Sequence, residues 1–445
     1  MKKKIERIVM IIVALNIFIS PLKTYAIDGT TEAGTLEEMM AGATALPVQS
    51  DALKNWPKGP TTNGRSAIVM EAGTGAILYA KNIDDRQFPA SITKLLTALI
   101  AFEKGDLSQK ITVSDNAVGC LEGGYANIGL KPGEIITLKD AIYATLLASA
   151  NEAAYVTGEG IAANEDEDYS WFIRQMNQKC QEIGAVNSHF VNTNGMPDSK
   201  HYTTARDMAL ITRELYQYPE FFNICQTPFY KIDAADPANE HAFSQSDKML
   251  IPGLEQYYEG VTGGKTGYTE EARSTLVTTA QRNGMNLICV VLHTYGSNSY
   301  NDTKALLDYG FDNFEKVDAS SLENGKEIRK VIPKEDSGYV ILPSTVKPKD
   351  VTLEIHHEQV EKSEADVLYL YQDQPVGVAK VELERSYVSS LRPNKKITLQ
   401  GVSKEEKKNS PIKWIFSVVL VVLLGGIFIV GKRNIRRKRR RRRRR

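Results

Sequence analysis

The sequence is poor in the residues that metal and redox sites require. Among 445 residues there are four cysteines and six histidines. No two cysteines form a Cys-x-x-Cys pair, so neither a zinc ribbon nor a thiol redox motif is predicted. No histidines form His-Glu-x-x-His or His-x-x-Glu-His, which excludes the usual zinc peptidase motifs. We therefore expect neither a metal ion nor a cofactor.

The central part of the chain also lacks an excess of basic charge. The net charge is +1, but the last fourteen residues carry +12 and residues 1–26 carry +4, so the remainder carries −15. Phosphate binding requires a basic face, so the negative net charge of this central part argues against nucleic acid as a partner. There is no internal repeat, and the length favours two or three domains.

Long hydrophobic runs are scarce, and the first one lies at the N-terminus. Residues 1–26 begin with three lysines, continue with the apolar run Ile8–Ile19 and end in Thr24-Tyr25-Ala26, a small-x-small cleavage pattern. This order predicts a secretory signal peptide. The alternative is an uncleaved signal anchor, for which an apolar core of about 12 residues is short.

The second hydrophobic run, Trp414–Val430, lies near the C-terminus and is free of charge. We predict a transmembrane helix over 413–431, preceded by a spacer at 401–412 and followed by a basic tail at 432–445. The alternatives are a buried core helix and, for the tail, a nucleic-acid arm. The flanking basic residues favour a span with a cytoplasmic tail. Residues 27 to about 412 would then lie outside the cytoplasm, on the outer face of the membrane, where the cysteines could pair. The sequence does not decide their pairing.

Between these segments the sequence predicts a leader or linker at 27–60, a first domain at 61–315 and a β-rich domain at 316–400. In the first domain we expect a hairpin (Ala67–Met70 and Ala76–Tyr79), a helix over Ser91–Lys104, helices from Leu138 to about Tyr218, strands at Ser274–Ala280 and Leu287–Leu292 joined by Asn283-Gly284, and a helix at Lys304–Tyr309.

Three short motifs occur in order: Ser91-Ile92-Thr93-Lys94, Ser149-Ala150-Asn151 and Lys265-Thr266-Gly267. Each is weak alone, since Ser344–Lys347 and Ser299–Asn301 also match the first two. The ordered set is typical of β-lactamases and penicillin-binding proteins.

The first motif suits nucleophilic catalysis. Ser91 would lie at a helix start, where backbone N–H groups favour negative charge, and Lys94 lies on the same face three residues on. A lysine takes the serine proton only if burial or a second cation, here Lys265, lowers its pKa. In isolation the same residues would be a helix cap and a solvated lysine.

The other two motifs would complete the site. Ser149 can relay a proton to a leaving amine, and Asn151 can orient Lys94. Gly267 would let a substrate backbone approach closely, while Lys265 and Thr266 offer a charge and a hydroxyl to a terminal carboxylate. Taken alone, these residues would be a helix cap and an exposed strand lysine.

Beyond the motifs, residues 129–134 (Gly-Leu-Lys-Pro-Gly-Glu), 201–209 (His-Tyr-Thr-Thr-Ala-Arg-Asp-Met-Ala) and 264–269 (Gly-Lys-Thr-Gly-Tyr-Thr) resemble blocks of the low-molecular-weight penicillin-binding proteins, the serine D-Ala-D-Ala carboxypeptidases of peptidase family S11. The resemblance implies an α/β (α+β) transpeptidase/β-lactamase-like domain with an antiparallel sheet and helices. A small all-β domain and one C-terminal transmembrane helix would follow it.

The resemblance also implies an activity, removal of the terminal D-alanine from peptidoglycan pentapeptides, with β-lactam antibiotics as covalent inhibitors. It makes Ser91 the acylated residue, Lys94 the proton acceptor, Lys265 a substrate-binding residue, and the N–H groups of Ser91 and Tyr268 the oxyanion hole. Two departures stand out. Arg273 replaces a glycine of many relatives, and 294–301 lacks the basic residue that some relatives place near the substrate carboxylate. Carboxylate recognition would then depend on Lys265 and Thr266, with Arg206 as a further candidate.

Two alternatives compete with this interpretation. A β-lactamase shares the motifs but adds a carboxylate that activates water, and Glu165 and Glu167 follow the second motif. A catalytically inactive cell-wall scaffold would use the β-rich domain to bind a partner. The lifetime of the acylated protein and its peptidase activity distinguish these readings.

Overall fold

The computed structural model describes residues 35–119, 124–233, 240–322, 324–332, 338–356 and 363–391. The expected signal peptide, spacer, transmembrane helix and basic tail lie outside these ranges, as does Cys120. No helix within the described ranges is long and apolar enough to cross a membrane. The other three cysteines, Cys180, Cys225 and Cys289, are buried free thiols.

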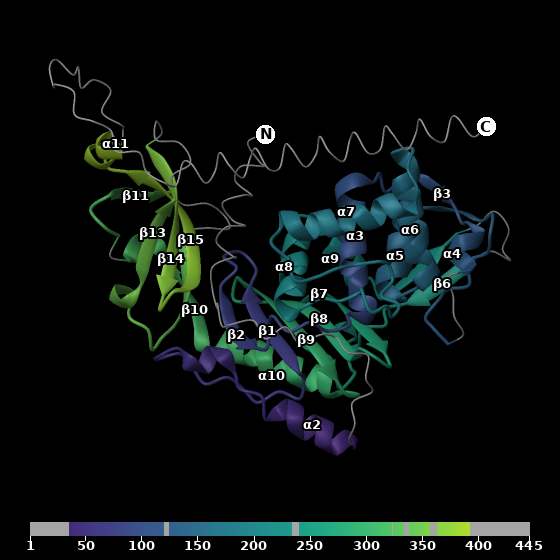
Figure 1. Ribbon diagram of the computed structural model, residues 1–445, viewed down its shortest axis with the longest axis horizontal. Helices are drawn as coiled ribbons and strands as arrows, with labels where there is room; N and C mark the ends of the chain where they lie inside the picture. The colour runs from purple at the N-terminus through teal and green to yellow at the C-terminus, as the bar shows by residue number, and fades with distance from the viewer. Residues whose placement is uncertain are drawn as a thin grey trace, which may run out of the picture. The chain divides into compact units, whose positions relative to one another are not determined.

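A five-stranded antiparallel sheet forms the centre of the first domain (Figure 1), with strand order β2-β1-β9-β8-β7. Its strands are β1 (Ser66–Glu71), β2 (Ile77–Lys81), β7 (Val261–Thr269), β8 (Arg273–Arg282) and β9 (Met285–Thr294). The expected hairpins β1–β2 and β8–β9 are both present. Asn283 and Gly284 have the positive φ angles, 51° and 75°, that a two-residue hairpin turn requires.

Helices cover both faces of this sheet. Most lie on one face, and α10 lies on the other (Figure 1). The helices are α2 (Leu36–Thr44), α3 (Lys94–Lys104), α4 (Asp115–Gly119), α5 (Leu138–Leu147), α6 (Asn151–Asn164), α7 (Tyr169–Glu182), α8 (Ala205–Leu215), α9 (Pro219–Cys225) and α10 (Asn298–Asn313). A further helix, α11 (Arg385–Leu391), follows the last strand of the β-rich region. The helix expected at Lys304–Tyr309 thus starts six residues earlier and ends four later.

Alternation along the strands divides the apolar side chains between two cores. Ile68 of β1 packs with the apolar residues of α3, α5, α6 and α8, whereas its neighbour Val69 packs on the side of α10. Two small hairpins flank the helical side, β3 (Lys110–Thr112) with β4 (Ile135–Thr137) and β5 (Phe229–Ile232) with β6 (His241–Ser244).

The β-rich region expected at 316–400 is an antiparallel sheet of six strands, ordered β10-β12-β15-β14-β13 with β11 also paired to β15. The strands are β10 (Phe314–Asp318), β11 (Ile328–Ile332), β12 (Tyr339–Pro343), β13 (Thr352–His356), β14 (Glu364–Tyr371) and β15 (Gln374–Leu383). Its apolar residues belong to the same buried cluster as those on the α10 side of the first sheet.

The structure differs from expectation at the supposed linker, because residues 35–60 are ordered. Thr35 caps α2 through a capping box with Glu38, in which each side chain bonds the other residue's N–H. Further on, Trp56 is buried, and its ring stacks on Tyr371 and contacts Phe314. This segment therefore packs against the β-rich region.

Candidate active site

The residue expected to be the nucleophile lies in a tight turn. Ser91 belongs to a 3₁₀ turn, η2 (Ala90–Thr93), and α3 begins only at Lys94. The single helix expected over Ser91–Lys104 is thus divided. Ala90 has φ +50°, a left-handed conformation that costs energy in a residue other than glycine. Strained backbone of this kind gathers at functional sites.

Lys94 lies at the centre of the site. Its Nζ donates to Ser91 Oγ at 2.9 Å, to Asn151 Oδ1 at 2.6 Å and to the Asn194 carbonyl at 2.8 Å. The side chain is fully buried. As a neutral amine, the nitrogen would keep two N–H groups for two of these oxygens and direct its lone pair at the serine hydroxyl. The arrangement therefore suits transfer of the Ser91 proton to Lys94.

Ser149 and Asn151 occupy the junction between α5 and α6. Asn151 is the first residue of α6, and Ser149 has φ +59°, so the chain turns sharply between the helices. Ser246 stabilises the end of α5 by donating its N–H and its hydroxyl to the Leu147 carbonyl. The structure thus brings Asn151 into direct contact with Lys94 and places Ser149 two residues away along the chain.

Strand β7 lies directly against the nucleophile turn. A Cβ at Gly267 would lie 2.9 Å from Ser91 N and 2.5 Å from Thr275 Oγ1, so this approach requires glycine. Thr275 in turn donates to the Pro89 carbonyl at 2.9 Å. The segments that carry the two expected oxyanion donors, the N–H groups of Ser91 and Tyr268, are therefore neighbours.

Lys265 lies inside the protein. It is 1% exposed, and its Nζ donates to the Thr266 carbonyl at 2.8 Å. Burial lowers the pKa of Lys265 to about 8, although the carboxylate of Asp247 acts in the opposite direction. Burial also raises the pKa of Asp247 to about 6. The lysine expected to meet a substrate carboxylate therefore has an internal position, while Thr266 and Gly267 are partly exposed.

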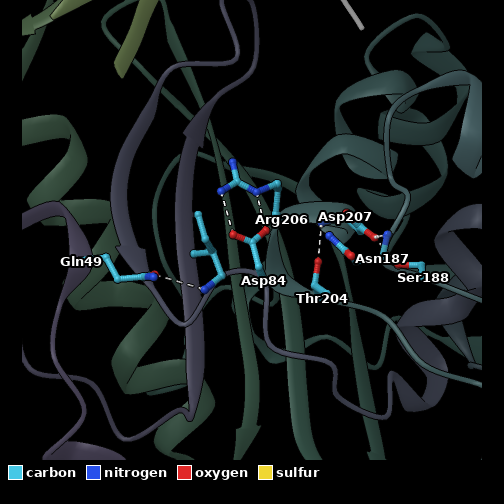
Figure 2. A network of polar contacts seen from close by, with 8 residues as sticks. Gln49, Asp84, Asn187, Ser188, Thr204, Arg206 and Asp207 are labelled. Atoms are coloured by element: carbon cyan, nitrogen blue, oxygen red, sulfur yellow. Dashed lines mark hydrogen bonds and ion pairs between the residues drawn. The ribbon is translucent and has the colours of Figure 1, made fainter. Parts of the chain in front are cut away.

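Arg206, the further candidate for substrate binding, pairs with Asp84. Its Nε donates to Oδ1 at 2.6 Å and its Nη2 to Oδ2 at 3.0 Å (Figure 2). Its N–H donates to the Ile83 carbonyl, and its side chain is 12% exposed. These contacts join the start of α8 to the chain after β2, and none of them is to the cluster around Lys94. The structure gives Arg206 a role in the fold.

A segment that no sequence motif marks closes the site beside Lys94. The Asn194 carbonyl accepts from Lys94, and Gly195, with φ +91°, packs against the nucleophile turn. A Cβ at Gly195 would lie 1.9 Å from the Ala90 carbonyl oxygen. The Asn-Gly dipeptide marks a turn in the sequence, but nothing in the sequence connects that turn to Ser91.

His201 was also missed as a part of the site. Its Nε2 lies 2.9 Å from Thr93 Oγ1, and the Val191 N–H donates to its Nδ1 at 3.1 Å. Because Nδ1 accepts, the proton is on Nε2 and is donated to Thr93. Burial lowers the pKa of His201 to about 3. A neutral histidine thus supports the turn between Ser91 and Lys94.

The described residues contain no group of His, Cys, Asp or Glu side chains arranged to hold a metal ion. What they bring together is a serine hydroxyl, a buried lysine, an asparagine amide and a strand beside the serine N–H. Such a set is suited to acyl transfer through a covalent serine ester.

Known proteins are similar to this chain in both sequence and fold. The chain is 33% identical over 260 residues to the D-alanyl-D-alanine carboxypeptidase DacF of Bacillus subtilis (strain 168), covering 56% of this chain and 63% of that protein. It is 30% identical to DacA of Haemophilus influenzae, covering 67% and 74%. The chain thus spans less than two thirds of the Bacillus protein.

Solved structures agree with these relatives. A D-alanyl-D-alanine carboxypeptidase from Mycobacterium tuberculosis H37Rv is 26% identical, with a TM-score of 0.52, and the match covers 60% of this chain and 96% of that one. The Streptomyces K15 DD-transpeptidase is 25% identical with a TM-score of 0.52, covering 57% and 100%. The family model of peptidase S11, D-alanyl-D-alanine carboxypeptidase, matches residues 54–296, more than half of the sequence. The chain belongs to this family.

Proposed function

We propose that the protein is a serine-type D-Ala-D-Ala carboxypeptidase that removes the terminal D-alanine from peptidoglycan pentapeptides. The observation that carries the proposal is the contact of the buried Lys94 Nζ with both Ser91 Oγ and Asn151 Oδ1. Family membership supplies the substrate class.

In the first step, Ser91 Oγ attacks the carbonyl carbon between the two D-alanines while Lys94 takes its proton. The N–H groups of Ser91 and Tyr268 stabilise the negative charge that develops on the carbonyl oxygen. Ser149 gives its hydroxyl proton to the amine of the departing D-alanine and receives in exchange the proton held by Lys94, so that the C–N bond breaks and Lys94 is neutral again. The remaining peptide stays bound to Ser91 as an ester.

In the second step, water attacks this ester, and its proton again passes to Lys94. The C–O bond to Ser91 breaks, the hydroxyl regains a proton, and the shortened peptide leaves with a new carboxylate. A β-lactam acylates Ser91 by the same first step, but its amine stays tethered to the acyl group. The antibiotic therefore remains bound for longer than the peptide.

The β-lactamase alternative needs a carboxylate beside the ester to activate water. Glu165 and Glu167 follow the last residue of α6, whereas Asn151 is the first. Fourteen helical residues span about 20 Å. Both glutamates are exposed, and Glu167 pairs with Arg174. These positions favour the carboxypeptidase.

Labelling with a fluorescent penicillin tests the nucleophile. We expect covalent labelling of the wild type and none of Ser91→Ala, because the ester forms on Oγ. Ser299→Ala, which alters the serine of an unrelated Ser-x-Asn match in α10, should label normally. Equal labelling of Ser91→Ala would remove Ser91 from its role.

Release of D-alanine from a pentapeptide ending in D-Ala-D-Ala tests the reaction itself. A protein that binds penicillin yet releases no D-alanine would favour the inactive scaffold.

We further propose that the protein is anchored by residues 413–431 to the outer face of the bacterial cell membrane, with residues 432–445 in the cytoplasm. Digestion of the enzyme domain by protease added to cells stripped of their wall supports this topology, and full protection contradicts it.

A further inference from the structure

In an enzyme that removes the last residue of a peptide, an accessible cation can bind the free carboxylate through charge-assisted hydrogen bonds. Lys265 is 1% exposed and donates to the Thr266 carbonyl, so its charge lies beneath the strand. Arg206 is held by Asp84. The hairpin that joins β7 to β8 carries a more exposed cation, Arg273, whose side chain is 30% exposed.

Arg273 lies close to the nucleophile along the sheet. It pairs with Thr269, and two residues further the pair Gly267–Thr275 lies beside Ser91 N. Consecutive strand residues rise about 3.4 Å, so the two pairs are about 7 Å apart. The hydroxyl of Thr275, two residues along β8 from Arg273, bonds to the nucleophile turn. This separation is within the reach of an arginine side chain.

The backbone of Arg273 is in an unfavourable conformation. Its φ is +55°, in the left-handed region that favours glycine. An arginine at this position is strained, and strain that is retained next to a site motivates a search for a function of the side chain.

Neighbouring side chains orient the guanidinium. Nη1 lies 3.0 Å from Glu270 Oε2, and the guanidinium carbon lies 5.6 Å from the centre of the Tyr295 ring. Glu270 is 77% exposed and also accepts from the Tyr268 hydroxyl at 3.1 Å. An ion pair this exposed is weak and exchanges readily for another anion. The other guanidinium nitrogens offer the planar fork that binds a carboxylate through two parallel hydrogen bonds.

We propose that Arg273 binds the C-terminal carboxylate of the peptide and so restricts the enzyme to the last peptide bond. This inference rests on the proposed carboxypeptidase function and names a specificity-determining residue for it. The Tyr295 ring packs against one face of the guanidinium. Glu270 forms an ion pair with the guanidinium until the substrate carboxylate takes its place.

The test compares two substrates, an acyl-D-Ala-D-Ala with a free carboxylate and the same peptide with a C-terminal amide. Arg273→Gln should lower kcat/KM for the free acid about 10- to 100-fold, the effect of losing a charge-assisted hydrogen bond. It should leave the amide almost unchanged. Arg273→Lys should recover part of the preference, since it keeps the charge without the fork.

Two further variants separate recognition from stability. Arg273→Gly relieves the backbone strain, so it should keep or raise the melting temperature while losing the preference for the free acid. Arg282→Gln removes an arginine from the other end of β8, where it pairs with Asp308 and Asp312, and should keep the preference. If the wild type is active and Arg273→Gln prefers the free acid as strongly as the wild type does, the role of Arg273 is overturned, while the proposed carboxypeptidase function stands. If the wild type cleaves neither substrate, both the inference and the proposed function are overturned.

Discussion

At the scale of residues, the site depends on backbone conformations that few side chains adopt. Ala90, Ser149 and Arg273 have φ angles of 50°, 59° and 55°. Each such residue costs about 1–2 kcal/mol. The first precedes the nucleophile, the second opens the loop before Asn151, and the third ends the β7–β8 hairpin. Packing in the rest of the fold must offset this cost, and the three residues accordingly lie next to well-packed helices and strands.

The contact between Asn151 and Lys94 can be tested by substitution. Asn151→Asp would place a carboxylate 2.6 Å from Nζ and so stabilise the ammonium form. If the amine accepts the serine proton as proposed, the acid limb of the acylation rate should move to higher pH. We expect the rate of penicillin acylation at pH 7 to fall at least about tenfold, since one pH unit is a factor of ten.

Stopped-flow acylation across pH 5–10 measures this effect. Asn164→Asp, at the other end of α6, provides the control and should leave the profile in place. An unchanged profile in Asn151→Asp would mean that Asn151 does not influence the proton acceptor.

At the scale of elements, three pieces of chain converge on the nucleophile turn: β7, the junction of α5 and α6, and the Asn194–Gly195 turn. Motif spacing predicted the first two of these, because the motifs themselves lie on them. The third was not predictable, since a carbonyl and a glycine carry no chemical signature. Likewise, the sequence suggested that Lys265 meets substrate directly, and only the structure reveals how deeply its side chain is buried.

Gly195 offers a direct test of this convergence. A methyl group there would lie 1.9 Å from the Ala90 carbonyl oxygen, so Gly195→Ala must displace the nucleophile turn. We expect penicillin acylation to fall more than about tenfold, because small displacements of reacting groups cost such factors. Gly253 has nearly the same φ, +89°, but open space around it.

Gly253→Ala therefore carries the same backbone strain without the clash, and should lose only about 1–2 kcal/mol of stability while acylating normally. Equal acylation rates in the two variants would contradict the account of Gly195. Urea unfolding and single-turnover labelling of both variants supply the comparison.

Helix α8 begins beside a second buried carboxyl group. Asp207 Oδ2 accepts from the Asn187 N–H at 2.8 Å and from the Ser188 hydroxyl at 2.7 Å (Figure 2). Burial nevertheless raises the pKa of Asp207 to about 6, from 3.8. The folded state thus holds the proton more tightly than the unfolded state. The stabilisation is complete below pH 3.8 and is lost as the pH rises through 6.

From this we predict that the wild type loses stability relative to Asp207→Asn between pH 4 and pH 7. The difference in unfolding free energy should change by about 2–3 kcal/mol, the equivalent of two pKa units. Urea titrations at each pH measure it, with the exposed Asp198→Asn as control. A difference that does not vary with pH would show that Asp207 stays ionised on folding.

At the scale of the whole molecule, sequence patterns predicted strands and helices in both regions but not how the two regions are connected. Alternation and the Asn-Gly turn predicted strands, and apolar periodicity predicted helices. Residues 27–60 have little periodicity, which predicts a linker, but Thr35 and Glu38 within them form a capping box. Their order comes from contacts distant in sequence. Tyr371, for example, donates to the Lys54 carbonyl, and Thr345 to that of Asn55.

One apolar cluster joins the α10 side of the first sheet to the β-rich sheet through Trp56. We therefore predict a single calorimetric unfolding transition for residues 35–391. Trp56→Ala should lower the unfolding free energy by about 3–5 kcal/mol, the usual cost of removing a buried tryptophan. The variant should still bind penicillin at low temperature, because Ile92 and Leu95, next to Ser91 and Lys94, pack in the other apolar cluster.

Differential scanning calorimetry with a penicillin-labelling assay measures both effects. Trp171→Ala, on α7 and only partly buried against the helical core, is the matched control and should cost less. Two separate transitions in the wild type would contradict a shared core.

The position of Trp56 has a practical consequence for protein production. A recombinant enzyme trimmed to residues 61–313 would lose Trp56, Phe314 and the six strands of the β-rich sheet. The truncation would expose a large apolar patch on the α10 side of the first sheet, and patches of this kind cause proteins to self-associate. Poor solubility of so short a fragment would reflect its missing cover and would not indicate a defective catalytic centre.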